Sequence, residues 1–257
     1  MSTGALDLPL LHDLIPHGIE YGTVLLVEFE PQSCWFDLAL SLVAQAVRAG
    51  AKTDLHLFQR KPDQVKASLT RAGLDVGKLQ QTDQLRILDS YTLQTGIGVP
   101  EEPSGGDSFL TQSLRVADWG SAAKRQIIEG IPESEKDRFH VDENISILSR
   151  YNREEEIVDY WRTRAIPRHK ERRTIFVNAV AVGVTSEGFH RQFESMADGV
   201  LDCRSREQDD RIQQQIRVRN LRGRSPDSRW QTVSVVDGEV RRDRSAGPPG
   251  TTGAGPE

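Results

Sequence analysis

The loop from residue 29 to residue 36 is the first place where residue types and spacing suggest chemistry. A run of buried-type residues before it predicts a strand, and an apolar-periodic run after it predicts a helix. Strand, loop and helix in this order form a phosphate-binding P-loop when the loop reads G-x-x-x-x-G-K-[ST]. That spacing fits without a gap, but Phe29 and Cys34 stand at the glycine positions, Trp35 at the lysine position and Phe36 at the Ser/Thr position. The loop therefore keeps the frame of a phosphate site and changes its functional residues.

These changes remove the interactions that hold a phosphate. A P-loop presents backbone N–H groups and a helix N-terminus, and its glycines let the phosphate approach closely. Its lysine neutralises phosphate charge and its hydroxyl binds Mg²⁺, and Trp35 and Phe36 can do neither. We expect both aromatic side chains to pack in the core or in an interface; a nucleotide held in another pose is the alternative. The degenerate loop consists of Phe29, Glu30, Pro31, Gln32, Ser33, Cys34, Trp35 and Phe36.

The composition limits the classes of protein to consider. The chain has 257 residues, 37% of them hydrophobic and 28% charged, which suits one large α/β domain or two small ones. A net charge of −5 gives no broad electrostatic reason to bind nucleic acid. We see no apolar run of about 20 residues and no signal-peptide pattern, so we expect no membrane span and a cytoplasmic location. Cys34 and Cys203 are too few for a disulfide framework or a zinc site.

Apolar runs with strand and helix periodicity alternate along most of the chain. This alternation predicts an α/β fold with a mainly parallel sheet covered by helices. The expected strands are 23–29, 53–58, 85–90, 145–149 and 174–181. The expected helices are 35–49, 62–73, 110–129, 153–170 and 186–197.

The pattern changes after residue 198. Three strand-like runs, 199–204, 212–221 and 230–236, follow one another closely, and VDGEV near their end is a tight-turn signal. We expect these strands to be antiparallel additions to the parallel sheet. The Gly/Pro-rich tail 243–257 should be disordered, so residues 1–242 are expected to form a single domain. The Gly/Pro-rich stretch 92–109 is expected to be an exposed loop.

Four segments of the sequence resemble one protein family. They are VLLVEFEPQSCWFDLAL, LHLFQRKPDQV with the following GLDVGKLQQTDQLRILDSYT, SEGFHRQFESMADGVLD, and IRVRNLRGRSPDSRW. In these segments the chain is similar to the KaiC-type branch of the RecA-superfamily ATPases, which is common in archaea. The resemblance implies a RecA-like αβα sandwich, usually assembled as a ring with nucleotide between the subunits.

The resemblance also shows which catalytic groups have changed. The family motif after the second main strand carries a glutamate that polarises the attacking water, and Gln59 and Arg60 occupy the glutamate positions here. Neither side chain can act as a carboxylate base. The family's Mg²⁺-binding aspartate ends a later strand. If that strand is ISILS, Ser149 takes the aspartate position; if the register differs, Asp142 or Glu143 supplies a carboxylate.

An arginine-rich run partly keeps a fourth family element. In family rings a basic pair on the strand after the last helix reaches the phosphates of the neighbouring subunit. The run IRVRNLRGR matches the arginine of that pair with Arg222, has Asn220 in place of the usual lysine, and also carries Arg219. Arg222 and Arg219 are therefore candidates to act in trans on an active neighbour. The alternative is a solvated edge strand whose alternating charge prevents aggregation.

The remaining charged and imidazole side chains give weaker signals. His140, His169 and His190 are dispersed without metal-ligand spacing, so structural or surface roles are expected for them. The acidic start of helix 153–170 is expected to be a solvated face. The basic stretch 162–173 lacks interleaved aromatic residues, so we expect a turn there and no nucleic-acid site.

Three losses of different chemical type favour one function. We expect a catalytically inactive KaiC/RecA-like domain that serves as a regulatory or scaffolding subunit, in a homo- or hetero-oligomer with KaiC-like proteins. We expect no ATP or Mg²⁺ cofactor and no metal site. The alternatives are a weakly ATP-binding KaiC-like ATPase involved in signalling, and a sensor that binds a small ligand in the former nucleotide cleft.

Overall fold

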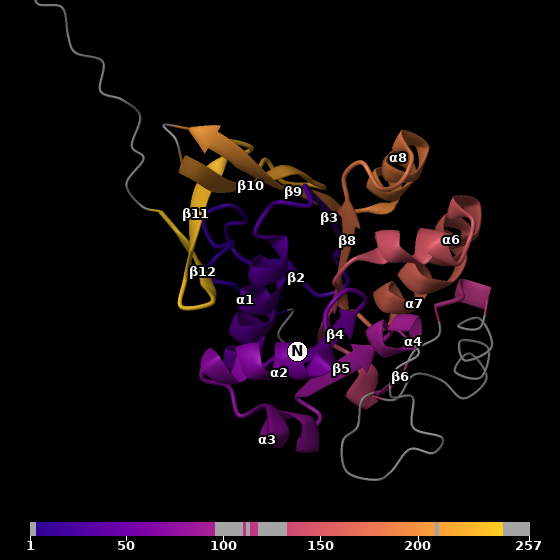
Figure 1. Ribbon diagram of the computed structural model, residues 1–257, viewed down its shortest axis with the longest axis horizontal. Helices are drawn as coiled ribbons and strands as arrows, with labels where there is room; N and C mark the ends of the chain where they lie inside the picture. Colours follow the sequence, from indigo (N-terminus) through magenta and orange to yellow (C-terminus); the bar gives the residue numbers. More distant parts are fainter. Residues whose placement is uncertain (1–3, 96–109, 112–113, 118–132, 209–210, 244–257) are drawn as a thin grey trace, which may run out of the picture.

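The computed structural model describes residues 4–95, 110–111, 114–117, 133–208 and 211–243, which form a mixed α/β fold around one large sheet. Within these residues the sheet has ten strands in the order β12-β11-β10-β9-β3-β8-β7-β4-β5-β6 (Figure 1). From β9 to β6 all neighbouring strands are parallel, whereas β9 to β12 pair antiparallel. A separate antiparallel pair near the N-terminus joins β1 (Ala5–Leu6) to β2 (Ile19–Glu20).

Apolar runs form the central parallel strands because both faces of the sheet are covered. Every residue of β3 and β8 is buried. The parallel strands are β3 (Val24–Phe29), β4 (Lys52–Leu57), β5 (Leu85–Asp89), β6 (Leu110–Thr111), β7 (Arg138–Asp142), β8 (Ile175–Ala181) and β9 (Gly199–Gln208).

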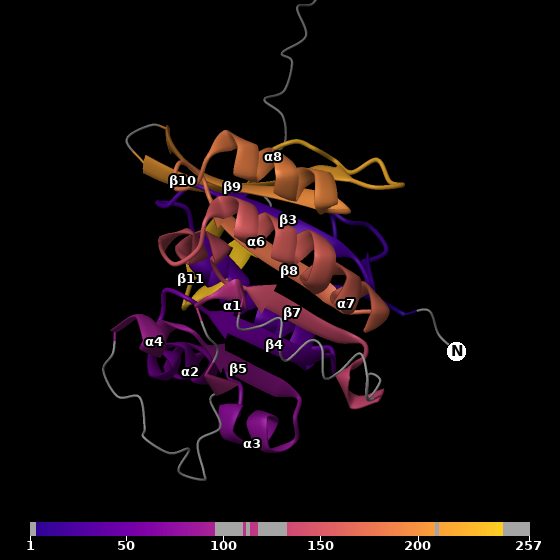
Figure 2. The same ribbon diagram turned by 90° about the vertical axis from the view of Figure 1, so that its right-hand side faces the viewer.

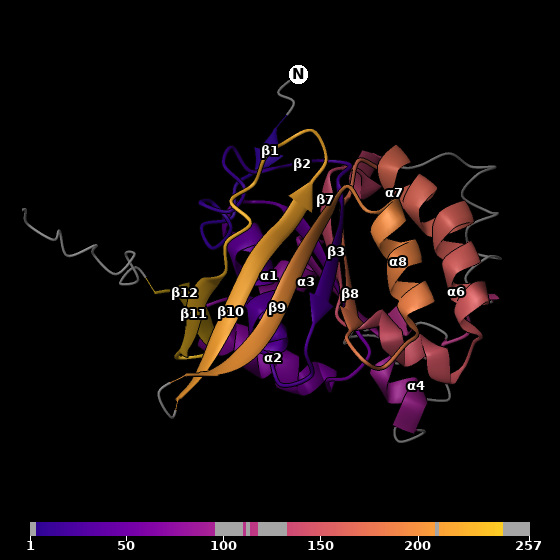
Figure 3. The same cartoon turned by 90° about the horizontal axis from the view of Figure 1, so that it is seen from above.

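Helices cover the two faces of the sheet (Figure 3). A hydrophobic core lies between the sheet and each helix layer. One layer contains α1 (Trp35–Arg48), α2 (Pro62–Arg71) and α3 (Val76–Gln81). The other contains α6 (Glu154–Tyr160), the π-helical turn η3 (Trp161–Ala165), α7 (Ile166–Glu171) and α8 (Glu187–Met196), which lie in front of the strands in Figure 2. Short helical segments are α4 (Tyr91–Thr95), η1 (Glu133–Glu135) and η2 (Ile145–Arg150).

The antiparallel extension predicted for the C-terminal part is confirmed for 212–221 and 230–236, whereas 199–204 belongs to β9, which also pairs parallel with β3. The extension consists of β10 (Arg211–Leu221), β11 (Gln231–Val236) and β12 (Glu239–Arg242), added beyond β9. The turn between β11 and β12 places Asp237 and Gly238 at φ 54° and 78°, a left-handed pair typical of a tight hairpin turn. The hairpin folds back onto α1, where the Val240 N–H donates to the Ser41 hydroxyl at 2.8 Å.

Four of the five predicted parallel strands are confirmed, and one is wrong. ISILS forms the 3₁₀ helix η2, because the Asn144 side chain accepts from the Ser146 N–H and turns the chain. The strand lies just upstream, at 138–142. Of the helix expected at 110–129, residues 110–111 form β6 instead, and most of the rest lies outside the described residues.

The other predicted helices begin and end within two residues of the expected bounds. The helix expected at 153–170 contains the π-helical turn η3, and the sequence does not predict α3. The tail 244–257 and most of 92–109 lie outside the described residues. Among the helices of the described part of the chain, none is long and apolar enough to cross a membrane.

Candidate functional site

The loops that carry the predicted site residues meet at the carboxyl edge of the parallel strands. Residues 30–34 follow β3, residues 58–61 follow β4, and residues 143–144 follow β7. β4 and β7 are neighbours, yet β4 continues towards β5 and β7 towards β8, on opposite sides of the pair. Such a divergence of connections marks the edge where α/β proteins place their ligands.

The loop 29–36 is filled by its own aromatic side chains. Trp35 is completely buried, its ring stacks on Phe29 with centroids 5.9 Å apart, and its indole N–H donates to the Glu143 carbonyl at 2.8 Å. Phe36, partly buried, meets Phe29 edge-on at 5.6 Å. Trp35, at the lysine position, therefore belongs to the hydrophobic core under α1, and Phe36, at the Ser/Thr position, packs against this core, as the sequence predicts.

Polar groups elsewhere in the chain form hydrogen bonds with this loop. The Cys34 N–H, at the start of α1, donates to the Gln214 side-chain oxygen at 2.7 Å. The Glu30 N–H donates to the Cys203 carbonyl at 2.9 Å, and the Glu30 carboxylate accepts from the Ser205 N–H at 3.1 Å. An acceptor from β10 thus stands at the helix end where a P-loop would bind phosphate.

Gln59 and Arg60 connect the loops after β4 and β7. The Glu143 carboxylate accepts from the Phe58 and Gln59 N–H groups at 3.0 and 3.2 Å, and burial raises its pKa. The Arg60 guanidinium lies 3.7 Å from Glu143 and 3.8 Å from Asp37. The positions predicted to have lost the catalytic glutamates therefore hold a guanidinium and an amide in local contacts.

The assignment of Ser149 to the aspartate position is wrong, because it requires ISILS to be a strand. Ser149 lies in η2, where its hydroxyl donates to the Ser146 carbonyl at 2.8 Å, and it does not end a strand. The residue that ends β7 is Asp142, and Glu143 follows it. Carboxylates at 142 and 143 thus stand at the end of a strand, the position that the alternative register gives them.

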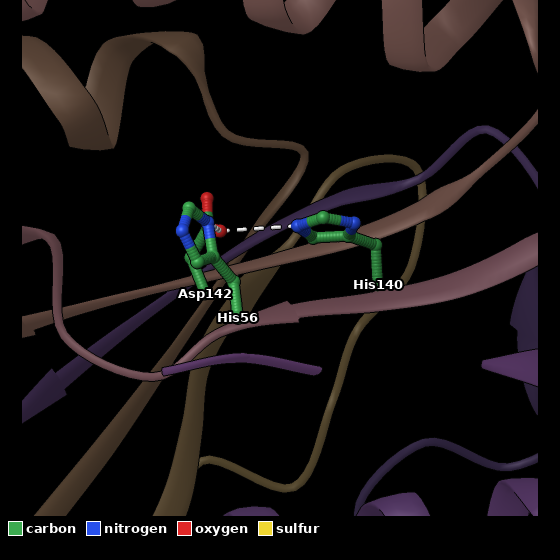
Figure 4. Close-up of side chains that lie close together, drawn as sticks. All are labelled: His56, His140 and Asp142. Atoms are coloured by element: carbon green, nitrogen blue, oxygen red, sulfur yellow. Dashed lines mark hydrogen bonds and ion pairs between the residues drawn. The ribbon is translucent and has the colours of Figure 1, made fainter. Parts of the chain in front are cut away.

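Asp142 belongs to a buried cluster with two histidines (Figure 4). Its Oδ1 lies 3.0 Å from His56 Nδ1 and 3.0 Å from His140 Nε2. His56 and Asp142 are register partners on β4 and β7, and His140 points to the same face because it lies two residues before Asp142. The three residues are between 3 and 8% exposed.

Polar side chains surround this cluster. The second nitrogen of His56, Nε2, lies 2.8 Å from the Ser90 hydroxyl. His140 Nδ1 lies 3.6 Å from Asp54 Oδ2, and Arg138 donates from Nε to both carboxylate oxygens of Asp54 at 2.9 Å. The hydrogen bonds and ion pairs compensate a set of charges that burial alone would strongly disfavour.

The electrostatics of the cluster differ between its two imidazoles. Burial lowers the pKa of His140, but Asp142 and Asp54 outweigh it and raise the pKa to about 9. For His56 burial is the stronger influence, and its pKa falls below the ordinary value. Burial raises the pKa of Asp54 and of Asp142, yet the neighbouring imidazoles, and Arg138 at Asp54, hold both well below the ordinary range.

The order Ser90, His56, Asp142 resembles the triad of a serine hydrolase. Ser90 is completely buried, and its N–H donates to the Leu57 carbonyl at 3.0 Å. A nucleophile needs access to substrate and a free donor for the oxyanion. Buried Ser90 is therefore a hydrogen-bond partner of His56 and is not placed to attack a substrate.

The two candidate trans-acting arginines differ in their surroundings. The Arg219 guanidinium contacts three carboxylates of the same chain, those of Glu28, Glu194 and Asp202. The Arg222 side chain is 65% exposed and lies 3.1 Å from Asp198. Arg222 follows the end of β10 that pairs with the start of β9, so it lies at the edge opposite the loop 29–36. Arg219 is engaged within the chain, whereas Arg222 faces solvent.

The sequence did carry a signal for the histidine cluster. The segments Asp54-Leu-His56 and His140-Val-Asp142 place an acid and an imidazole two residues apart on two strands. Alternation puts both pairs on one face of a sheet. The histidines are dispersed along the sequence, and only the pairing of the strand at 138–142 with β4 brings His56 and His140 together.

Comparison with known proteins adds no relative to this description. No family model matches the chain, and a search of curated proteins returns no match.

Proposed function

We propose that the chain is a KaiC/RecA-like domain that does not hydrolyse ATP and serves as a regulatory or scaffolding subunit. One observation carries this proposal: a fully buried Trp35 occupies the position of the P-loop lysine. An indole cannot neutralise phosphate charge, and its burial removes the space that a phosphate would fill. The strand–loop–helix frame from β3 to α1 and the mostly parallel sheet are compatible with this fold.

The charges around the loop also oppose phosphate binding. Glu30 and Asp37 lie in or directly after the loop, and Glu143 contacts it through the Trp35 indole. The Arg60 guanidinium lies among these groups, within 4 Å of both Asp37 and Glu143. A triphosphate would have to displace these contacts without gaining a lysine.

Titration with Mg-ATP tests the proposal. We expect no heat of binding, no rise in Tm at about 1 mM Mg-ATP, and no phosphate release above background. A micromolar site would stabilise the native state by about 4 kcal/mol at that concentration, which a thermal scan detects easily. A clear rise in Tm with ATP, absent with inorganic phosphate, contradicts the proposal.

We further propose that the subunit assembles with an ATP-binding relative and presents Arg222 to the neighbour's nucleotide. Its exposed guanidinium supports this, because a planar fork pairs with phosphate oxygens bidentately. The test mixes the chain with a KaiC-like ATPase from the same cell and measures ATP hydrolysis.

The matched variants are Arg222→Ala and Arg241→Ala, since Arg241 is exposed to 61% and also pairs with an acid, Glu239. We expect Arg222→Ala to remove the stimulation while the complex still forms, and Arg241→Ala to leave it unchanged. Equal stimulation by both variants in a complex shown to form would reduce the arginine-rich strand to a solvated edge.

A further inference from the structure

We propose that His56, His140 and Asp142 form a binding site for one divalent transition-metal ion. Their ligand atoms all lie within 4.8 Å of one another. Imidazole nitrogens and a carboxylate oxygen are ligands typical of Zn²⁺, and two histidines with one carboxylate also suit Fe²⁺ and related ions. The site is independent of the degenerate loop and of the proposed regulatory function.

The geometry of the three ligand atoms is close to what an ion requires. His56 Nδ1 and His140 Nε2 point at the same Asp142 oxygen from 3.0 Å each (Figure 4). Ligand atoms about 2.1 Å from a tetrahedral ion lie about 3.4 Å apart. Both distances from Asp142 Oδ1 to an imidazole nitrogen are thus about 0.4 Å shorter than this spacing, and the two imidazole nitrogens lie within 4.8 Å of each other.

The second ring nitrogen of each imidazole already has a partner. Metal-binding histidines usually donate their other N–H to a carboxylate, carbonyl or hydroxyl group, which fixes the ring and its tautomer. Here Asp54 Oδ2 lies 3.6 Å from His140 Nδ1, and the Ser90 hydroxyl lies 2.8 Å from His56 Nε2. Both rings are thus oriented with the nitrogen that would bind the ion towards Asp142.

The supporting elements and the local charge fit a cation. The ligands lie on paired strands, β4 and β7, and such positions hold a metal geometry more firmly than loops do. The carboxylates of Asp54 and Asp142 lie beside the imidazoles, and buried Asp89 interacts electrostatically with His56. Arg138 opposes them from Asp54. These carboxylates face Arg138 and the protonated His140 ring, so a bound divalent cation would take the place of the His140 proton among them.

Metal titration of the untagged, EDTA-treated full chain tests the site. Co²⁺ is followed by its visible absorption, and Zn²⁺ by calorimetry. We expect one ion per chain and a higher Tm with metal. His56→Gln and His140→Gln should lose more affinity than the roughly 10- to 100-fold that is typical when a residue that only hydrogen-bonds to a metal ligand is replaced. Ser90→Ala, which removes such a partner, should weaken binding about 10-fold.

His12→Gln is the matched control, because His12 pairs with the Asp7 carboxylate at 3.0 Å but is exposed. It should bind Co²⁺ as the wild type does. Circular dichroism verifies the fold of each variant. If a histidine variant does not fold, the test rests on two other measurements: the metal affinity of Ser90→Ala and the rise in Tm of the wild type with metal. The proposal is overturned if the wild type shows neither Co²⁺ absorption nor a rise in Tm at millimolar metal. It is also overturned if the His56 and His140 variants bind metal as tightly as His12→Gln does. The cluster would then be a buried ion-pair network only.

Discussion

Replacing Trp35 by alanine tests whether the side chain at the lysine position is part of the core. The indole is fully buried, stacks on Phe29 and donates to the Glu143 carbonyl. Truncating a buried Trp costs about 3–5 kcal/mol, and the lost hydrogen bond adds about 1 kcal/mol. We therefore expect Trp35→Ala to lower the free energy of unfolding by about 4–6 kcal/mol, much of the total for an ordinary domain.

Two comparisons separate the contributions. Trp35→Phe keeps a ring against Phe29 and loses the donor, so it should cost about 1–3 kcal/mol. Trp230→Ala removes the same residue type from a partly buried position, where the guanidinium groups of Arg204 and Arg217 lie 3.6 and 4.4 Å from the ring centre. That loss should be about 1–2 kcal/mol.

Urea denaturation followed by far-UV circular dichroism measures these differences, because the substitutions themselves change the fluorescence. The restoring variant Trp35→Lys should be destabilised to a similar degree and still bind no Mg-ATP. The reasoning is refuted if Trp35→Ala costs no more than Trp230→Ala, because the indole would then not be structural.

Gln214→Ala should lower the free energy of unfolding by about 1 kcal/mol in urea denaturation, because the Cys34 N–H loses its acceptor; unchanged stability contradicts a capping role. Burial raises the pKa of the Cys34 thiol to about 11, and the Cys203 thiol is also buried. Both should react with DTNB at pH 8 only after unfolding, and fast labelling of the native protein would argue against this packing. Arg219→Gln should lower Tm clearly, because it leaves three carboxylates together. Arg222→Gln should change the free energy of unfolding by no more than about 0.5 kcal/mol. Equal Tm values for Arg219→Gln and Arg222→Gln would contradict a stabilising role of Arg219 within its own chain.

Periodicity predicted the parts of the fold whose burial follows from apolar residues. β3 and β8 are apolar runs buried on both sides, and their bounds agree with the prediction to one residue. The sequence does not reveal β7, because Arg138, His140 and Asp142 give this strand a surface-like pattern. These side chains are buried through partners on β4, and a local pattern contains no information about such partners.

The sequence predicts the local features of the site and not its long-range contacts. The aromatic filling of the loop 29–36 follows from residue types at fixed spacing, which the sequence displays directly. The acceptor for the Cys34 N–H comes from Gln214, 180 residues away in the chain. The contact of His56 with Asp142 depends on the register of two parallel strands, which is set by the whole sheet.

The central position of β3 has a consequence during synthesis of the chain. Its hydrogen-bonding neighbours are β8 and β9, which are among the later strands to be translated. Val24, for example, donates to the Asp198 side chain, which is 174 residues further along. At about 5–20 residues per second this interval lasts roughly 9–35 s. For that time an apolar strand has left the ribosome without its partners, so the nascent chain offers a binding site to chaperones that the finished protein lacks.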